Sequence, residues 1–226
     1  MAQAAPAPGQ TFDRIAAAGA GAGAVTGSSA GPLENALEAF LISTGVVALS
    51  EMGDKTQLLA LLLAARFRRP LPITLGILAA TLLNHSAAAA LGAWLAAQMG
   101  PTLLRWVIGL GFLAMAAWML IPDRADGGAV RGRIRLGVFG TTLVTFFLAE
   151  MGDKTQIATV ALAARFHDLA AVVAGTTLGM LLADVPAVFL GGRIATAVPM
   201  RLVHGIAAFV FAALGVLTLL NVGGVF

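Results

Sequence analysis

Long apolar stretches, separated by short polar or Gly/Pro-containing connections, occupy most of the chain after residue 35. Six of them are long enough to cross about 30 Å of hydrocarbon as helices of about 20 residues each. They lie near Ala36–Ala65, Leu71–Gln98, Leu103–Ile121, Leu136–Ala164, Leu169–Leu190 and Leu202–Leu220. The pattern therefore predicts an all-α membrane protein with six transmembrane helices.

The polar segments predict how these helices are grouped. Residues 1–35 are mostly Ala, Gly, Pro and Ser, which is typical of a flexible N-terminal tail. The largest polar connection, 122–135, lies between the third and fourth stretches. We therefore expect a first three-helix repeat at 36–121, a connecting loop at 122–135 and a second three-helix repeat at 136–226.

Composition supports the membrane assignment and excludes several other classes. Hydrophobic residues make up 59% of the chain and charged residues 11%, against about 25% charged in soluble domains. The chain has no cysteine, which excludes a disulfide framework, a thiolate metal site and cysteine catalysis. The net charge is +3, but the basic residues do not alternate with aromatic ones, so we expect no nucleic-acid partner.

Self-comparison indicates an internal duplication. A shift of 99 residues places the heptapeptide Glu51–Gln57 on Glu150–Gln156 without a mismatch, and Ala64–Phe67 on Ala163–Phe166. Each half holds three predicted spans, so the second half enters the membrane in the opposite sense to the first. The sequence thus predicts an inverted repeat, an arrangement common in transporters with a binding site at the midplane.

The arginines predict the orientation in the membrane. Nine lie in the loops on one side and three on the other, which places the first, third and fifth loops in the cytoplasm and both termini outside. The nine are Arg66, Arg68, Arg69, Arg124, Arg131, Arg133, Arg135, Arg193 and Arg201, and the three are Arg14, Arg105 and Arg165. We expect His167 and His204, near the ends of spans, to lie at the interface.

The two identical heptapeptides hold most of the charges found within apolar stretches. A charge at bilayer depth costs about 3 to more than 10 kcal/mol, so retained charges point to a function. The acids of each motif are three residues apart and so share a face of a helix, and convergence of the two faces would form an oxygen cage suited to a hard divalent cation such as Mn²⁺ or Ca²⁺. The expected ligands are the carboxylates Glu51, Asp54, Glu150 and Asp153 and the amides Gln57 and Gln156, with the hydroxyls Thr56 and Thr155 as secondary groups. Gly53 and Gly152 allow close helix approach or local unwinding.

Other polar residues in the apolar stretches are candidates for charge balance or proton coupling. Lys55 and Lys154 are the only lysines, and with four carboxylates they leave a charge of minus two, which one divalent ion or two protons would cancel. The 99-residue shift pairs His85 with Asp184, both expected as proton carriers or outer partners of the cage. Asn84 is a secondary candidate. The alternative is that these charges form structural salt bridges and that His85 only packs.

The repeated Glu-Met-Gly-Asp-Lys-Thr resembles the signature Glu-x-Gly-Asp-[Lys/Arg]-[Thr/Ser] of the Golgi-type divalent cation/proton antiporter family. That family includes a Golgi calcium and manganese transporter and bacterial and chloroplast manganese transporters. The resemblance implies six or seven transmembrane helices and Glu51, Asp54, Glu150 and Asp153 as ion ligands. We favour six, because the N-terminal tail is too polar for another span. The resemblance also implies manganese export across a bacterial inner membrane.

These observations favour a secondary transporter over an enzyme. It would exchange Mn²⁺ or Ca²⁺ for protons by alternating access and would need no cofactor. A divalent cation channel or a structural membrane protein are the alternatives. An intramembrane hydrolase is disfavoured, because the three histidines do not form a His-Glu-x-x-His motif. The sequence leaves open the choice of ion, the proton stoichiometry and the oligomeric state, for which a homo-oligomer is one candidate.

Overall fold

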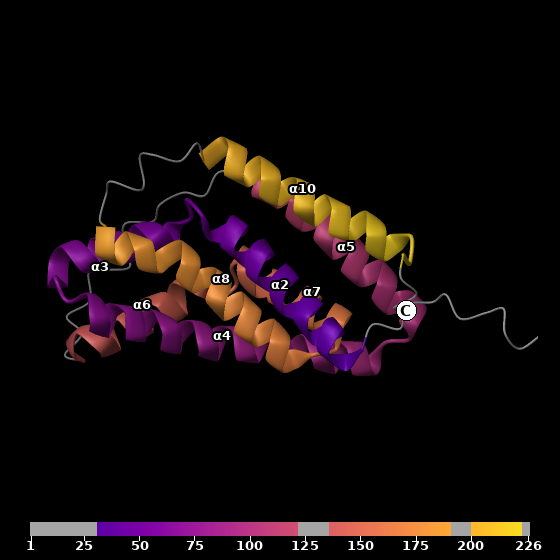
Figure 1. Ribbon diagram of the computed structural model, residues 1–226, viewed down its shortest axis with the longest axis horizontal. Helices are drawn as coiled ribbons and strands as arrows, with labels where there is room; N and C mark the ends of the chain where they lie inside the picture. Colours follow the sequence, from indigo (N-terminus) through magenta and orange to yellow (C-terminus); the bar gives the residue numbers. More distant parts are fainter. Residues whose placement is uncertain (1–30, 122–135, 191–199, 223–226) are drawn as a thin grey trace, which may run out of the picture. The chain divides into compact units, whose positions relative to one another are not determined.

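The computed structural model describes residues 31–121, 136–190 and 200–222, and this part of the chain is helical, without strands (Figure 1). The contacts discussed below lie within Asn35–Phe226, one of the two units into which the chain divides. The helices are α2 (Pro32–Glu51), α3 (Lys55–Phe67), α4 (Pro70–Gln98), α5 (Pro101–Met119), α6 (Gly137–Glu150), α7 (Lys154–Phe166), α8 (Leu169–Leu190) and α10 (Met200–Leu219).

Five of the described helices, α2, α4, α5, α8 and α10, are long and apolar enough to cross a membrane, and α6 is a shorter apolar helix. Many large apolar side chains on these helices are exposed, among them Leu83, Trp94, Leu182 and Phe209. Such an outer surface suits hydrocarbon better than water. The expectation of an all-α membrane protein is confirmed for the described residues.

The sequence placed the helix boundaries well except at the two heptapeptides. The spans expected at 36–65 and 136–164 are each two helices, and the breaks fall after Glu51 and Glu150. Gly53 and Gly152 adopt φ of 84° and 79°, a left-handed backbone that a continuous helix excludes. The predicted tail, apart from its last residues at the start of α2, and the connection 122–135 lie outside the described residues.

The 99-residue sequence repeat is also a repeat of backbone conformation. The helix that follows each break starts at the corresponding residue, Lys55 in α3 and Lys154 in α7. Both helices end in a left-handed residue, Arg68 with φ of 52° and His167 with φ of 54°. The backbone N–H of that residue donates in each case to the carbonyl four residues earlier. The two halves therefore fold locally in the same way.

Packing joins each half to the other. Helix α4 of the first half packs against α6 and α7 of the second, and α8 packs against α3. Gly76 of α4 faces the carbonyl oxygen of Phe139 in α6, and Gly175 of α8 makes the corresponding approach to Phe40 in α2. Each broken helix is thus held by the long helix of the opposite half, which brings the two breaks together.

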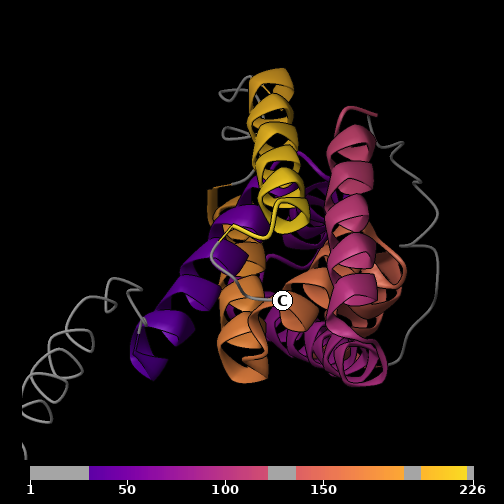
Figure 2. The same cartoon turned by 90° about the vertical axis from the view of Figure 1, so that its right-hand side faces the viewer.

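The third helices of the two halves form a pair. Helices α5 and α10 lie side by side (Figure 2), and the rings of Phe112 and Phe211 meet with centroids 6.2 Å apart. Both rings belong to one apolar cluster, which also holds Leu162 of α7. A second cluster, with Leu63, Ile77 and Phe146, joins α3, α4 and α6. Each cluster therefore contains residues from both halves.

Replacing Gly92 by Ala should lower stability, because this residue of α4 lies directly against α7. A Cβ there would clash with the carbonyl oxygen of Val160, a backbone atom that cannot rotate away. We expect the melting temperature of the detergent-purified protein to fall, at an overpacking cost of about 1–3 kcal/mol. Gly111→Ala is the control, since a Cβ there meets nothing within 4 Å. An unchanged melting temperature for Gly92→Ala would contradict this helix contact.

Candidate metal site

The two breaks place acidic residues at helix ends. Glu51 is the last residue of α2 and Asp54 is the N-cap of α3, and Glu150 and Asp153 stand in the same places between α6 and α7. In both breaks the aspartate N–H donates to the glutamate carbonyl at 3.1 Å. The expectation that each acid pair shares one helical face is therefore wrong. The glycine turns bring the acids of each motif together instead.

One carboxylate oxygen from each acid meets in a compact group, here named the carboxylate cluster. The four oxygens, from Glu51, Asp54, Glu150 and Asp153, all lie within 4.8 Å of one another. The residues are 1%, 5%, 1% and 6% exposed. Each half thus contributes two carboxylates to a single buried cluster, although the two motifs lie 99 residues apart in the sequence. Repulsion among four such groups favours a bound cation or bound protons.

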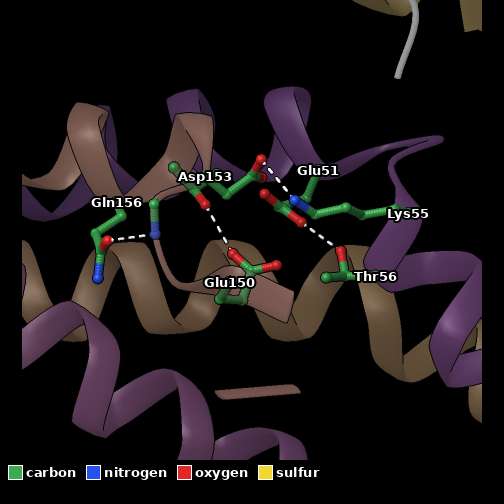
Figure 3. Close-up of polar contacts among 8 residues, drawn as sticks. Glu51, Lys55, Thr56, Glu150, Asp153 and Gln156 are labelled. Atoms are coloured by element: carbon green, nitrogen blue, oxygen red, sulfur yellow. Dashed lines mark hydrogen bonds and ion pairs between the residues drawn. The ribbon is translucent and has the colours of Figure 1, made fainter. Parts of the chain in front are cut away.

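Threonines from within each motif hold the glutamates. The Oγ1–H of Thr56 donates to Glu51 Oε2 at 2.7 Å (Figure 3), and that of Thr155 donates to Glu150 Oε2 at 2.9 Å. The other oxygen of each glutamate, Oε1, is buried and accepts no hydrogen bond from the residues the structure describes. Each glutamate therefore has one oxygen fixed by the protein and one available to a ligand.

The glutamines fold back onto their own breaks. Gln57 Oε1 accepts from the Gly53 N–H at 3.2 Å, and Gln156 Oε1 accepts from the Gly152 N–H at 2.7 Å. Gln57 also donates through Nε2 to the carbonyl of Ala183 in α8 at 3.0 Å. The amide oxygens thus stabilise the turns, and their role as metal ligands stays a prediction.

The two lysines differ in environment although their motifs are identical. Lys55 Nζ lies 2.8 Å from Asp153 Oδ1, an ion pair that joins the two halves (Figure 3). Its side chain is 32% exposed, whereas Lys154 is 3% exposed. The Lys55 side chain therefore places a positive charge beside the cluster while it remains partly exposed, whereas Lys154 is buried.

The two predicted proton carriers are buried, His85 on α4 and Asp184 on α8. Asp184 is fully buried, and neither of its carboxylate oxygens has a hydrogen-bond partner within the described segments. The same holds for both ring nitrogens of His85, which is 1% exposed. Asn84 donates to the carbonyl of Phe147 in α6 at 3.1 Å, so it joins two helices. The proton-coupling role of His85 and Asp184 stays a prediction.

One residue near the breaks was not recognised from the sequence. His204 of α10, expected at the interface, places Nε2 at 3.1 Å from the carbonyl oxygen of Met52. The only available signal was the 99-residue alignment of position 204 with Arg105, another residue able to donate a hydrogen bond. That alignment gives no information on which half such a residue contacts.

Comparison with known proteins shows which family the sequence resembles. The family model of the divalent cation/proton antiporter GDT1 matches residues 39–127 and 138–224. A Vibrio cholerae protein named "Putative manganese exporter" is 47% identical over 189 residues, which is 83% of this chain and 93% of the relative. GDT1-like protein 3 of Oryza sativa is 26% identical over 205 residues, covering 79% and 72% of the two chains. No solved structure matches the chain significantly.

Replacing Gly152 by Ala should destabilise the second break through the backbone alone. A Cβ at this position meets no atom within 4 Å, but φ is 79°, which costs a residue with a Cβ about 1–2 kcal/mol. We expect a lower melting temperature for Gly152→Ala and a partial recovery for Gly152→Asn, because asparagine tolerates left-handed backbone better than alanine. Equal melting temperatures for Gly152→Ala and the unmodified protein would contradict the left-handed turn.

Proposed function

Because the chain belongs to the GDT1 family of divalent cation/proton antiporters, we propose that it exports Mn²⁺ across a membrane in exchange for protons. The observation that carries this proposal is the buried carboxylate cluster, to which both halves contribute two acids. The relative named as a manganese exporter supports Mn²⁺ and the outward direction. Ca²⁺ is the alternative ion, since it also binds to oxygen cages.

The proposed ion ligands are the four carboxylates, with Gln57 and Gln156 at the margin of the site. Glu51 and Glu150 are oriented by their threonines, so that Oε1 of each is left for the ion. Carboxylate oxygens suit Mn²⁺ and Ca²⁺ better than soft ions. Thr56 and Thr155 act as supports of the ligands in this proposal.

Proton exchange follows from charge balance in a medium of low polarity. Four carboxylates and two lysines sum to minus two, so that one divalent ion or two protons neutralise the site. An empty, unprotonated cluster would leave uncompensated buried charge, which is costly. Release of the ion therefore favours proton uptake. We assign His85 of α4 and Asp184 of α8, which are both buried, as further places where protons bind in transit.

Alternating access is the mechanism we propose for this exchange. Each broken pair, α2 with α3 and α6 with α7, would form one span, giving six spans in two inverted repeats, 36–121 and 136–226. In Figure 1 the corresponding helices α4 and α8 run in opposite directions, which supports the inversion. The unequal exposure of Lys55 and Lys154 supports a site that opens on one side at a time. We place both termini outside, in the inner membrane of a bacterium.

Removal of any cluster carboxylate should abolish transport. The variants Glu51→Gln, Asp54→Asn, Glu150→Gln and Asp153→Asn keep size and remove the charge that holds the ion. We expect Mn²⁺ uptake into proteoliposomes with an acidic interior to fall more than about 100-fold, since even hydrogen-bond partners of metal ligands contribute about 10- to 100-fold. Asp168→Asn is the control, because Asp168 lies outside the cluster and caps α8 through Oδ1, which an asparagine oxygen can replace.

The same assay separates this function from the alternatives. Saturable Mn²⁺ uptake that requires the pH gradient supports the antiporter. Electrodiffusive Mn²⁺ current without proton movement would support a channel, and no flux of either Mn²⁺ or Ca²⁺ would support a structural protein. Full transport by any two of the four cluster variants would contradict the site assignment.

Joint replacement of Lys55 and Lys154 by Gln should change the proton coupling. Without the two ammonium groups the cluster holds protons more tightly, so we expect the pH of half-maximal Mn²⁺ uptake to rise. Measuring uptake against pH for Lys55→Gln with Lys154→Gln tests this. The matched control is Lys55→Arg with Lys154→Arg, which keeps both charges. If the Gln pair shows the pH dependence of the unmodified protein, the lysines take no part in charge balance.

A further inference from the structure

The third helix of the second half contacts the break in the first half. Nε2 of His204 lies 3.1 Å from the carbonyl oxygen of Met52, and because a carbonyl only accepts, this nitrogen carries the hydrogen and donates. We infer that His204 is a positioning residue for the ion site, which fixes the turn between Glu51 and Asp54. This inference rests on the proposed function.

The Met52 carbonyl, which His204 contacts, belongs to the turn that connects the cluster residues Glu51 and Asp54. The last carbonyls of a helix have no partner within it, and Met52 directly follows the final residue of α2. In this turn the Gly53 N–H is bound by Gln57 and the Asp54 N–H by the Glu51 carbonyl. The bond from His204 adds a contact on this turn from a residue outside the motif.

The two halves differ at the position of His204. At the position corresponding to His204 the first half has Arg105, whose Nε is buried without a hydrogen-bond partner among the described residues. Two identical motifs are therefore held differently. The effect of His204 should be confined to the carboxylates of the first half.

The far end of α10 provides a matched control. There, Nη1 of Arg165 at the end of α7 donates to Thr218 Oγ1. Thr218 is about 21 Å along the helix from His204 at 1.5 Å per residue. Removing this second bond weakens the attachment of α10 without touching the turn at Met52.

The test compares Mn²⁺ transport kinetics in proteoliposomes. His204→Leu should raise KM for Mn²⁺ about 3- to 10-fold, the effect of one lost hydrogen bond, while maximal rate stays within about twofold. His204→Gln should restore KM, because its Nε2–H can donate to the same carbonyl. Thr218→Val should leave KM unchanged. A change in KM without a change in maximal rate separates positioning of ligands from loss of folded protein.

Each other outcome has a defined meaning. An unmodified protein that does not transport Mn²⁺ refutes the proposed function. If it transports Mn²⁺ but His204→Leu has the same KM, the positioning role alone is refuted. An equal rise in KM for Thr218→Val also refutes it, since attachment of α10 would then be the cause. If His204→Leu does not fold, His204→Gln and His204→Asn serve instead. Both variants carry a side-chain amide, but the asparagine side chain is one methylene shorter and reaches less far. Equal KM values for the two variants overturn the inference.

Discussion

The mutual repulsion of four buried carboxylates is the constraint on which the rest of this structure depends. Their oxygens lie within 4.8 Å of one another on residues at most 6% exposed. Threonine hydroxyls and the Lys55 ammonium compensate part of this charge. The N-termini of α3 and α7, where Asp54 and Asp153 are the caps, add partial positive charge. The remaining charge must be met by an ion or by protons, which is the physical basis of the exchange we propose.

Breaking the helices is what makes such a cluster possible. An unbroken helix would present one side-chain face to the site and no free backbone ends. A turn after Glu51 and after Glu150 instead places a helix end and a helix start beside the carboxylates. The turn needs a left-handed residue, and Gly53 and Gly152 provide it. The long helices of the opposite halves then hold the broken ones close through glycine contacts such as that of Gly175 with Phe40.

The sequence predicted the helices and the acidic residues better than the contacts between them. Apolar length located α4, α5, α8 and α10 to within a few residues, and self-comparison identified both motifs. Apolar length did not reveal the breaks, because the charged heptapeptides are short and lie between apolar residues on both sides, so that each predicted span ran through its break. Gly53 and Gly152 indicated only that local unwinding was possible there. The bonds from Gln57 to Ala183 and from His204 to Met52 join residues 126 and 152 positions apart. No local pattern contains that information, since it depends on how the halves pack.

The two motifs are identical in sequence but lie in different surroundings, and this difference affects the transport cycle that we propose. In an inverted repeat, the two access states arise when the halves exchange conformations. If corresponding residues were identical throughout, the two states would have equal intrinsic energy. Here the surroundings differ in residue type, with His85 opposite Asp184 and Arg105 opposite His204. Exchange of conformations cannot exchange these side chains. In the cycle we propose, these residues outside the repeated motif therefore give the two states different energies and different affinities for ion and proton.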